Sequence, residues 1–434
     1  VFANLEQRFG EDWLLKINTA HTRGNVQNMR LYGTGNPDPA TGAGIYLRTA
    51  AGDSEDTRRN IDAYLTGTFP LFGREHDVTL GAQWSDLEGT THTVALNYPR
   101  DWATCGRERC YYIPNVYDWN GDISEVTYTR TGARRVQKTT QSGVYLAARL
   151  RLADPLSLIA GARLSRWETL SRSYSVAGAY TGTSGAYKVS DEVTPYVGLV
   201  YDVTPQFSVY ASYTEIFNPQ NFKDRNENLL APVQGSNLEA GIKTQWFDGR
   251  LTANAAVFEA KQDNYAVRDM GVPEGSLSDG TSAYIGVNGT KSRGWEMDVN
   301  GEILPGWTVN AGFTHVKVTR AATDLLYANP PEDLLQLNTQ VRLRGALERL
   351  SLGAGVQWQS KVQGYNIPYP LGGTVTVNQP AYTLVQFNAN YRISDNWTAT
   401  LSVRNALDKT YWANLDYNNY GEPRFVAASL RWKF

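Results

Sequence analysis

The residues that could carry out chemistry in this chain are few and widely separated. Its only histidines are His21, His76, His92 and His315. No HExxH, GxSxG, phosphate-binding loop or CxxC motif accompanies them. A Ser-His or Asp-His catalytic arrangement would need a histidine beside its partner, and a histidine without such a motif is usually solvated. We therefore predict no catalytic residue, no metal held by protein ligands and no enzymatic activity.

The chain has two cysteines, Cys105 and Cys110, separated by Gly-Arg-Glu-Arg in a polar, tyrosine-rich stretch. This close spacing predicts a short structural disulfide formed in an oxidising compartment. A zinc site would need further ligands nearby, and no histidine is close in the sequence. We expect the disulfide to shape the loop that carries it.

Aromatic residues, which make up 12% of the chain, are the other group that could act on a ligand. Several gather in segments predicted to be long loops. Rings hold a large, flat ligand by stacking and by phenol hydrogen bonds, although any single ring could instead pack its own loop. As a set we interpret them as candidate ligand contacts, with Trp119 and Tyr417 first, followed by Tyr111, Tyr112, Tyr117, Trp102, Tyr365, Tyr369, Trp412 and Tyr420.

The elements that must position these residues are β-strands. In residues 420–434, apolar side chains alternate with small or charged ones, and the chain ends on the aromatic Phe434. A period of two is typical of a strand with one apolar face. The pattern recurs along the chain as strand pairs, each joined by a tight turn and followed by a long polar loop. The tight turns are predicted at 10–12, 72–74, 154–155, 204–205, 248–249, 305–306, near 346, and at 395–396.

This repetition predicts an all-β fold, a transmembrane antiparallel β-barrel with short periplasmic turns and long extracellular loops. We count about 17 strands by the period-two pattern. Single-chain bacterial barrels have even strand numbers, so we expect strands to be missing at the N-terminus. Helical membrane spans are excluded because no apolar run approaches about 18 residues. The alternative is that the last strand belongs to a soluble sandwich.

The two strand faces and the loops predict where the polar residues lie. Arginines on the polar face are expected to line the lumen and to hydrogen-bond other groups inside it, facing carboxylates among them; they are Arg149, Arg151, Arg163, Arg342, Arg344 and Arg404. The long loops are predicted at about 22–55, 90–135, 170–190, 217–236, 263–283, 318–332, 360–380 and 409–422.

Three stretches carry a resemblance to a known family. They are SYTEIFNPQN (212–221) with 230–243; 258–266 with SRGWE (292–296) and LPGW (304–307); and VRNALDKTYW (403–412) with YGEPR (420–424) and the final Phe434. They resemble the TonB-dependent outer-membrane receptors, in particular the ferric-siderophore receptors, from about residue 60 onward. The stretch NVYDWNG (115–121) is similar to the branch that takes up hydroxamate or pyoverdine-type siderophores.

The resemblance implies a barrel of about 22 strands with a plugged lumen. It also implies an N-terminal plug domain and a short motif that binds TonB. We therefore expect residues 1–434 to be the C-terminal part of the barrel, with the plug domain and first strands absent from this chain. The implied function is binding of a ferric siderophore at the extracellular face and its import with TonB-derived energy.

The resemblance further implies a location in the bacterial outer membrane, in contact with lipid and lipopolysaccharide. TonB would act together with ExbB and ExbD, through the missing N-terminal region. Iron would be bound by the transported siderophore, so no cofactor is expected, and the protein would be a monomer. The net charge of −2 gives no argument for a nucleic-acid partner.

Other functions of the same architecture stay open at this point. The first alternative is a receptor for haem, cobalamin or an oligosaccharide. The haem variant would need a histidine-bearing loop, for which His92 alone is weak support. The second is a passive porin, which needs no plug, and a structural or adhesive barrel is a third.

Overall fold

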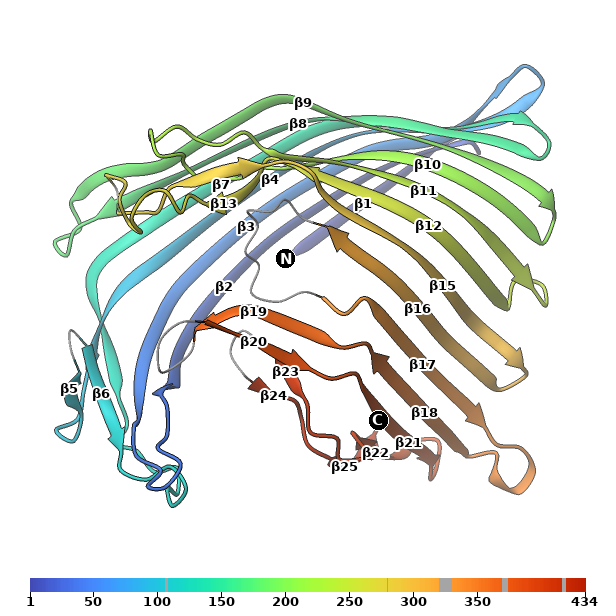
Figure 1. Cartoon of the computed structure of the whole chain (residues 1–434). Coiled ribbons are helices and arrows are strands. Elements are labelled where there is room, and N and C mark those ends of the chain that lie inside the picture. The colour runs from blue at the N-terminus through green and yellow to red at the C-terminus, as the bar shows by residue number, and fades with distance from the viewer. Residues whose placement is uncertain (106–107, 279, 320–329, 369–373, 416–418) are drawn as a thin grey trace. The chain divides into compact units, whose positions relative to one another are not determined.

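The computed structural model describes residues 1–105, 108–278, 280–319, 330–368, 374–415 and 419–434 (Figure 1). The chain forms two compact units, which we describe separately. One comprises Val1–Ala148 and Gly161–Thr194, and the other comprises Arg149–Ala160 and Pro195–Phe434. Within the described ranges, no helix is long and apolar enough to cross a membrane.

The first unit is built on long antiparallel strands. Strand β1 (Phe2–Phe9) pairs with β2 (Trp13–Gly35), which pairs with β3 (Ile45–Leu71), which pairs with β4 (Arg74–Asn97). Strand β4 then pairs with β7 (Thr127–Ala153). Two short strands, β5 (Ala103–Cys105) and β6 (Glu108–Ile113), pair with each other, and β6 also pairs with the start of β3. Strands β7, β8 (Leu156–Tyr174) and β9 (Tyr180–Thr204) each contribute residues to both units.

In the second unit every long strand pairs antiparallel with the next one along the chain, starting from the end of β9. These strands are β10 (Phe207–Asn218), β11 (Val233–Trp246), β12 (Leu251–Asp263), β15 (Thr290–Leu304), β16 (Trp307–Thr319), β17 (Asp333–Arg342), β18 (Leu350–Gln359), β21 (Tyr382–Arg392), β22 (Trp397–Arg404) and β25 (Phe425–Trp432). Shorter hairpins lie in the loops: β13 (Tyr265–Arg268) with β14 (Tyr284–Val287), β19 (Val362–Pro368) with β20 (Thr374–Gln379), and β23 (Trp412–Asn414) with β24 (Asn419–Tyr420).

The eight tight turns predicted from the sequence are all confirmed, because each coincides, to within one residue, with the junction of two consecutive long strands. Glycines or residues with positive φ lie in several of them, such as Gly10 at +64° and Phe72 at +50°. The turn near 346 contains a short 3-10 helix, η1 (Gly345–Leu347). Turn chemistry and strand alternation therefore locate the hairpins correctly.

At the ends of the hairpins next to the long loops, the strands extend further than predicted. Strands β2 and β3 stay in register from Trp13 opposite Gly67 to Gly35 opposite Ile45. The loop predicted at about 22–55 is therefore only 36–44, and the loop predicted at 90–135 is 98–126. Most side chains of these outer strand segments are polar or small, with only scattered apolar residues such as Val26, Met29 and Leu47, so apolar alternation weakens while main-chain pairing continues. The extent of pairing is therefore hidden from a reading of the apolar pattern.

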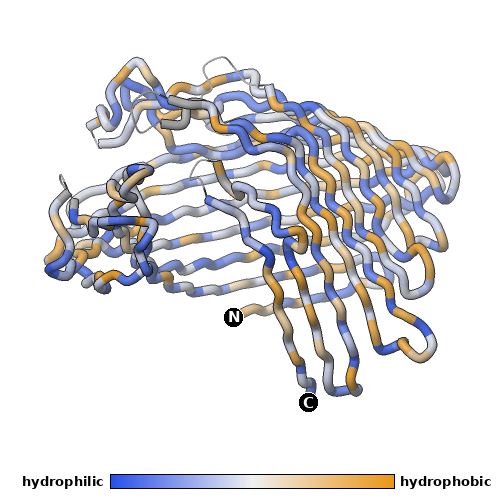
Figure 2. Tube along the Cα trace, turned by 60° about the horizontal axis from the view of Figure 1, so that its bottom comes forward, coloured by the Kyte–Doolittle hydropathy of each residue, from blue (hydrophilic) through white to orange (hydrophobic). Residues whose placement is uncertain are grey.

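Exposed apolar side chains recur at alternate positions of the strands, and hydrophobic and hydrophilic residues alternate along many of the strands (Figure 2). In the first unit Ile61 and Leu80 are 45% and 56% exposed on one face. In the second unit Leu352, Phe387 and Leu401 are similarly exposed. Exposed apolar side chains in alternate positions are what a lipid-facing surface requires. We call this the outward face.

Gly294, in the SRGWE stretch, lies where a side chain would not fit. A Cβ built at this position would lie 2.1 Å from the carbonyl oxygen of His315 and 2.8 Å from the ring of Phe258. Phe258 is the cross-strand partner of Gly294 on β12. An aromatic ring that covers a glycine on the neighbouring strand is a known way to fix strand register.

We predict that Gly294→Ala destabilises the barrel by about 1–3 kcal/mol, because the new methyl group must displace a main-chain carbonyl. The free energy of unfolding in denaturant would be measured on the full-length protein in detergent. Gly312→Ala is the matched control, since its Cβ would meet only the Met297 carbonyl at 3.9 Å. Equal stability of the two variants would contradict the prediction.

Candidate functional site

A small apolar core lies among the loops of the first unit. Its buried members are Leu47, Trp102, Ile113 and Val126. Trp102 is only 1% exposed, and its ring lies 5.2 Å from Tyr98 and 5.8 Å from Tyr111. The core joins the start of β3 to the loop 98–126 and gives that loop a fixed shape.

Three of the predicted ligand contacts belong to this core. Trp102 is buried in it, and Tyr111 and Trp119 pack against it. The Trp119 indole also donates a hydrogen bond to the carbonyl of Asp122 at 3.2 Å. These rings hold the loop together, and in this conformation Trp102 offers no surface to a ligand.

The neighbouring residue Tyr112 lies on the other face of the same strand. Tyr46 pairs with Tyr112, and Leu47 pairs with Tyr111. Because strand faces alternate, Tyr111 and Leu47 enter the core while Tyr46 and Tyr112 lie on the opposite face. On β3, Tyr46 lies on the same face as Asp62 and Tyr64. This face is opposite to the outward face, on which Ile61 lies.

Two further side chains extend this surface. On β2, Tyr32 lies opposite Arg48 and is 45% exposed. The Arg48 guanidinium lies 5.5 Å from the centre of the Tyr46 ring. We call Tyr32, Tyr46, Arg48 and Tyr112 the tyrosine row. It combines stacking rings, phenol groups and a cation on the face directed to the interior and mouth of a barrel.

The loop 98–126 also touches the loop 36–44. The main-chain amide of Val116 donates to the carbonyl of Gly42 at 3.0 Å. A Cβ on Gly42, whose φ is +69°, would lie 1.9 Å from the Asn115 side-chain oxygen. Tyr117 lies beside Gly42 at this contact, and its side chain is 62% exposed. Of the predicted contacts in this unit, Tyr112 and Tyr117 are therefore the most accessible.

In the second unit the predicted contacts Trp412 and Tyr420 come together. They are cross-strand partners in the β23–β24 ribbon, with ring centroids 6.3 Å apart. The Trp412 main-chain amide donates to the buried Gln379 side chain at 2.8 Å. Tyr420 is 68% exposed. The ribbon is therefore anchored through the main chain of Trp412 and presents the exposed ring of Tyr420.

The ribbon is tied to the barrel by Asn405 of the NALDK stretch. Asn405 is 6% exposed and has a φ of +44°. Its side-chain amide donates to the carbonyls of Lys409 and Glu422, both at 2.9 Å, and its oxygen accepts from the Lys409 amide at 2.9 Å. One side chain thus closes the loop that leaves β22 and returns to β25.

Two more loops of the second unit, 219–232 and 264–289, pack on each other. Phe222 and Tyr284 have ring centroids 4.4 Å apart. Asp269 is 5% exposed and accepts from the Gly271 amide at 2.9 Å and from Arg225 at 2.7 Å. The backbone hydrogen bond, followed by the Arg225 contacts, holds the pKa of Asp269 below its ordinary value of 3.8.

Some predicted residues lie outside the described part of the chain. They are Tyr369 and Tyr417, together with the side chains of Tyr365 and Cys105. Cys110 is fully buried. The roles of these residues, including the pairing of Cys105 with Cys110, stay predictions.

The histidine considered for haem, His92, lies among carboxylates. Its Nε2 is 3.4 Å from Glu55, which also pairs with Arg130 at 3.1 Å. Glu55 has the parity of Ile61 on β3, so this cluster lies on the face opposite the tyrosine row. Among the described residues, no group of three or more His, Cys, Asp and Glu is arranged to hold a metal ion.

Three of the six arginines predicted to line the lumen, Arg163, Arg344 and Arg404, make side-chain contacts that the structure shows in detail. Arg404 pairs with the Glu422 carboxylate at 2.7 Å, and Arg163 donates to Gln83 at 3.1 Å. Arg344 differs, because β17 ends at Arg342 and Arg344 lies in the following turn. There its guanidinium donates to the carbonyl of Pro305 at 2.8 Å.

Sequence reasoning missed Tyr32, Tyr46 and Arg48 because they fell inside a segment predicted to be a loop. A signal was present, since Arg30, Tyr32 and Thr34 alternate, as do Tyr46 and Arg48. If the alternation had been followed through this mainly polar segment, it would have placed Tyr32, Tyr46 and Arg48 on one face of the sheet.

Comparisons with known proteins agree with this architecture. Residues 1–406 match the family described as TonB dependent receptor-like, beta-barrel. The whole chain is 33% identical over 443 residues to the ferripyoverdine receptor of Pseudomonas aeruginosa and covers 51% of it. It is 26% identical over 382 residues to the ferrioxamine B receptor of Salmonella typhimurium, with 81% of this chain and 50% of that protein covered. The chain thus spans about half the length of the curated relatives it matches.

Solved structures show the same similarity. The ferripyoverdine receptor of the Pseudomonas aeruginosa outer membrane, bound to ferripyoverdine, has a TM-score of 0.84 at 32% identity. The alignment covers 100% of this chain and 56% of that one. The closed form of an Escherichia coli ferric-catecholate import receptor has a TM-score of 0.78 at 20% identity, covering 100% and 63%, which shows a shared fold.

We predict that Asn405→Asp opens the β23–β24 ribbon, because a carboxylate cannot donate to the Lys409 and Glu422 carbonyls. Losing two buried hydrogen bonds should cost about 1–3 kcal/mol of local stability. Hydrogen exchange over residues 405–424 would measure the change. Asp408→Asn is the control, since it keeps the oxygen that accepts from the Arg424 amide. Equal protection in both variants would contradict the role given to Asn405.

The Asp269 carboxylate should make its loop pair sensitive to acid. A pKa lowered by folding stabilises the loops above pH 3.8 and loses this effect as the pH falls through the folded pKa. We expect Asp269→Asn to reduce hydrogen-exchange protection of 219–232 and 264–289 at about pH 6. The difference from the wild type should shrink near pH 3. A difference that does not change with pH would refute this.

Proposed function

This chain belongs to the TonB-dependent receptor-like β-barrel family, and from that premise we propose that it serves ferric-siderophore uptake. Family membership makes it part of an all-β, transmembrane antiparallel β-barrel of the bacterial outer membrane. The predicted fold class and localisation are therefore confirmed. The proposed function of the whole protein is binding of a pyoverdine-type ferric siderophore at the extracellular face, followed by TonB-dependent import.

The observation that carries this proposal is the match to a ferripyoverdine receptor over the entire chain. The tyrosine row supplies a place for such a ligand. Its rings can stack on a flat chromophore or chelate, and its phenol groups and Arg48 can hydrogen-bond oxygen-rich groups. Tyr117, Trp412 and Tyr420 are the further contacts that we propose from the predicted set.

The finer parts of the function are proposals for the whole protein. TonB, with ExbB and ExbD, would supply the energy through the plug domain. Iron would stay in the siderophore, so the protein would need no cofactor and would act as a receptor rather than as an enzyme. We further propose a monomer surrounded by lipid and lipopolysaccharide, with no nucleic-acid partner. Uptake of a different ligand, or passive porin activity, would be seen in the test below.

We predict that Tyr112→Ala weakens binding of ferric pyoverdine by a factor of about 2 to 13, since one ring contact contributes about 0.5–1.5 kcal/mol. Tryptophan fluorescence of the full-length protein in detergent would be titrated with ferric pyoverdines, ferrioxamine B, haem and cobalamin. Saturable quenching by a ferric siderophore would support the function. Binding of haem or cobalamin alone, or ion conductance without any binding, would contradict it.

The control for this titration is Tyr201→Ala. Tyr201 is 45% exposed on β9, close to the turn at 204–205 and therefore at the other end of the hairpin from the loops. Its loss should leave siderophore affinity unchanged. Trp102→Ala tests the loop core instead, and we expect it to lower loop stability together with affinity. Equal affinity of the wild type and Tyr112→Ala would exclude a contact at the tyrosine row.

A further inference from the structure

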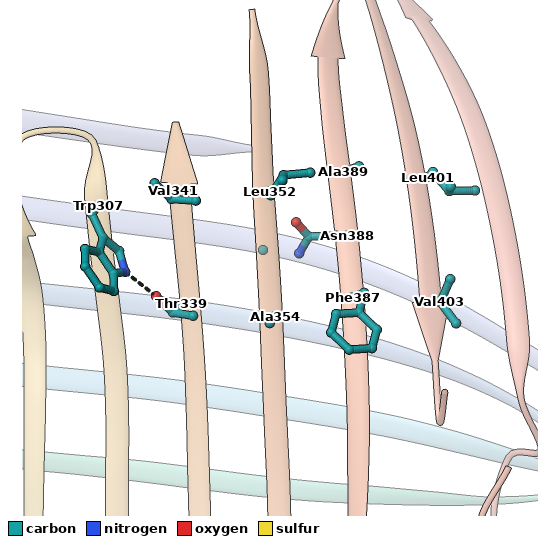
Figure 3. A pocket seen from close by; sticks show the side chains of 11 residues that line it. Trp307, Thr339, Val341, Leu352, Ala354, Phe387, Asn388, Ala389, Leu401 and Val403 are labelled. Carbon is teal, nitrogen blue, oxygen red and sulfur yellow. Dashed lines mark hydrogen bonds between the residues drawn. The ribbon is translucent and has the colours of Figure 1, made fainter. Parts of the chain in front are cut away.

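A groove of about 520 Å³ crosses the outward face of the second unit (Figure 3). Side chains from five neighbouring strands, β16, β17, β18, β21 and β22, line it. Nearly all of its lining is apolar, and the Trp307 indole N–H is satisfied by the Thr339 hydroxyl at 2.8 Å. The lining residues of the outward face are Trp307, Thr339, Val341, Leu352, Ala354, Phe387, Ala389, Leu401 and Val403.

Small residues between large ones produce the groove. Ala354 lies opposite Thr339 on one side and opposite Phe387 on the other. Ala389 lies opposite Leu352 and Leu401. The small side chains form the floor, and the larger rings and branched chains form the walls. Because strands are about 4.8 Å apart, five strands give the groove a length of about 19 Å.

The groove lies in the part of the surface that hydrocarbon surrounds. Leu352, Phe387 and Leu401 are 41%, 51% and 48% exposed, which is unfavourable in water and normal in lipid. Trp307 directly follows the turn at 305–306, and Val341 and Leu352 lie close to the turn that contains η1. Short turns mark the periplasmic end, so the groove lies toward the periplasmic leaflet.

The turn between β17 and β18 adds positive charge at this end. It carries Arg344 and Arg349 with a single carboxylate, Glu348. The Arg344 guanidinium donates to the Pro305 carbonyl at 2.8 Å, and the Arg349 guanidinium donates to the Ile393 carbonyl at 3.1 Å. These bonds hold both arginines across the neighbouring turns. Each guanidinium has five N–H donors, so these two hydrogen bonds leave further donors for phosphate oxygens.

We propose that this surface binds a phospholipid of the periplasmic leaflet. One acyl chain lies in the groove over Ala354 and Ala389, and the headgroup phosphate binds Arg344 and Arg349. Arginine binds phosphate through paired, charge-assisted hydrogen bonds, and basic groups at the membrane boundary recognise anionic headgroups. The positive charge of the two arginines complements a headgroup phosphate, and the apolar groove, which begins at the same strand ends, complements an acyl chain. Together they favour a phospholipid as the occupant.

The siderophore is a poor fit for this groove. A polar iron chelate would leave its oxygens without partners against the apolar lining, which is costly in hydrocarbon. The tyrosine row belongs to the first unit and the groove to the second, and their linings differ in chemistry, so the two sites serve different ligands. The proposal therefore goes beyond the proposed uptake function and can fail independently of it.

Native mass spectrometry of the full-length protein in detergent would test the proposal. The probes are phosphatidylglycerol and a diacylglycerol with the same acyl chains but no phosphate. Ala354→Phe should fill the groove and reduce retention of both lipids about tenfold. Arg344→Gln with Arg349→Gln should reduce retention of phosphatidylglycerol by a similar factor and leave diacylglycerol unchanged. Replacing both arginines by lysine should restore most phosphatidylglycerol binding.

Ala240→Phe is the matched control, because Ala240 is an exposed alanine of the same parity as the exposed Leu238 and Ile242 on β11. It should retain phosphatidylglycerol like the wild type. Equal losses in Ala354→Phe and Ala240→Phe, or unchanged retention in Ala354→Phe, would overturn the proposal. Co-purification of a protein in place of lipid would overturn it too. Siderophore titration and heat-modifiable electrophoretic mobility would verify that every variant is folded and active.

Discussion

Main-chain hydrogen bonding between antiparallel strands is the constraint on which the rest of this structure depends. A strand within hydrocarbon must pair every amide and carbonyl, because no water is available to satisfy them. Pairing fixes the side-chain period at two, and each residue is thereby assigned to one face. The apolar groove, the lumen-facing polar residues and the tyrosine row all follow from this assignment. A register shift of one residue would exchange them.

The same alternation explains why neighbouring aromatics have different roles. Tyr111 and Tyr112 are adjacent in sequence, yet one packs against Trp102 in the loop core and the other lies on the accessible face. The core gives the loop its shape, and the exposed ring is presented on a surface that is already ordered. Pre-ordering reduces the entropy lost when a ligand binds, which favours recognition by rings with few rotatable bonds.

The sequence was sufficient to predict the fold class, the strand order and all eight tight turns, because these depend on apolar alternation and local turn chemistry. It could not show where the outer ends of the hairpins stop, since apolar residues are too scattered there to produce a clear alternation. It also could not separate Trp102 from Tyr112, because the burial of Trp102 depends on contacts between the start of β3 and the loop 98–126, which are distant in sequence. Arg344 was misplaced for a related reason, because its strand ends two residues earlier.

The outer ends of the hairpins and their periplasmic ends solve different physical problems. At the outer ends, charged and polar residues such as Asn405 and Asp269 satisfy loop main chain in water, and their contacts decide which rings a ligand meets. At the periplasmic ends the turns are short, and side chains there must match a boundary between hydrocarbon and headgroups. Arginines that reach across adjacent turns meet that second requirement, and they do so at the strand ends from which the groove over Ala354 and Ala389 begins. Sequence features that look unrelated, two alanines and two arginines, thus acquire a common explanation once strand pairing brings them to the same edge of the sheet.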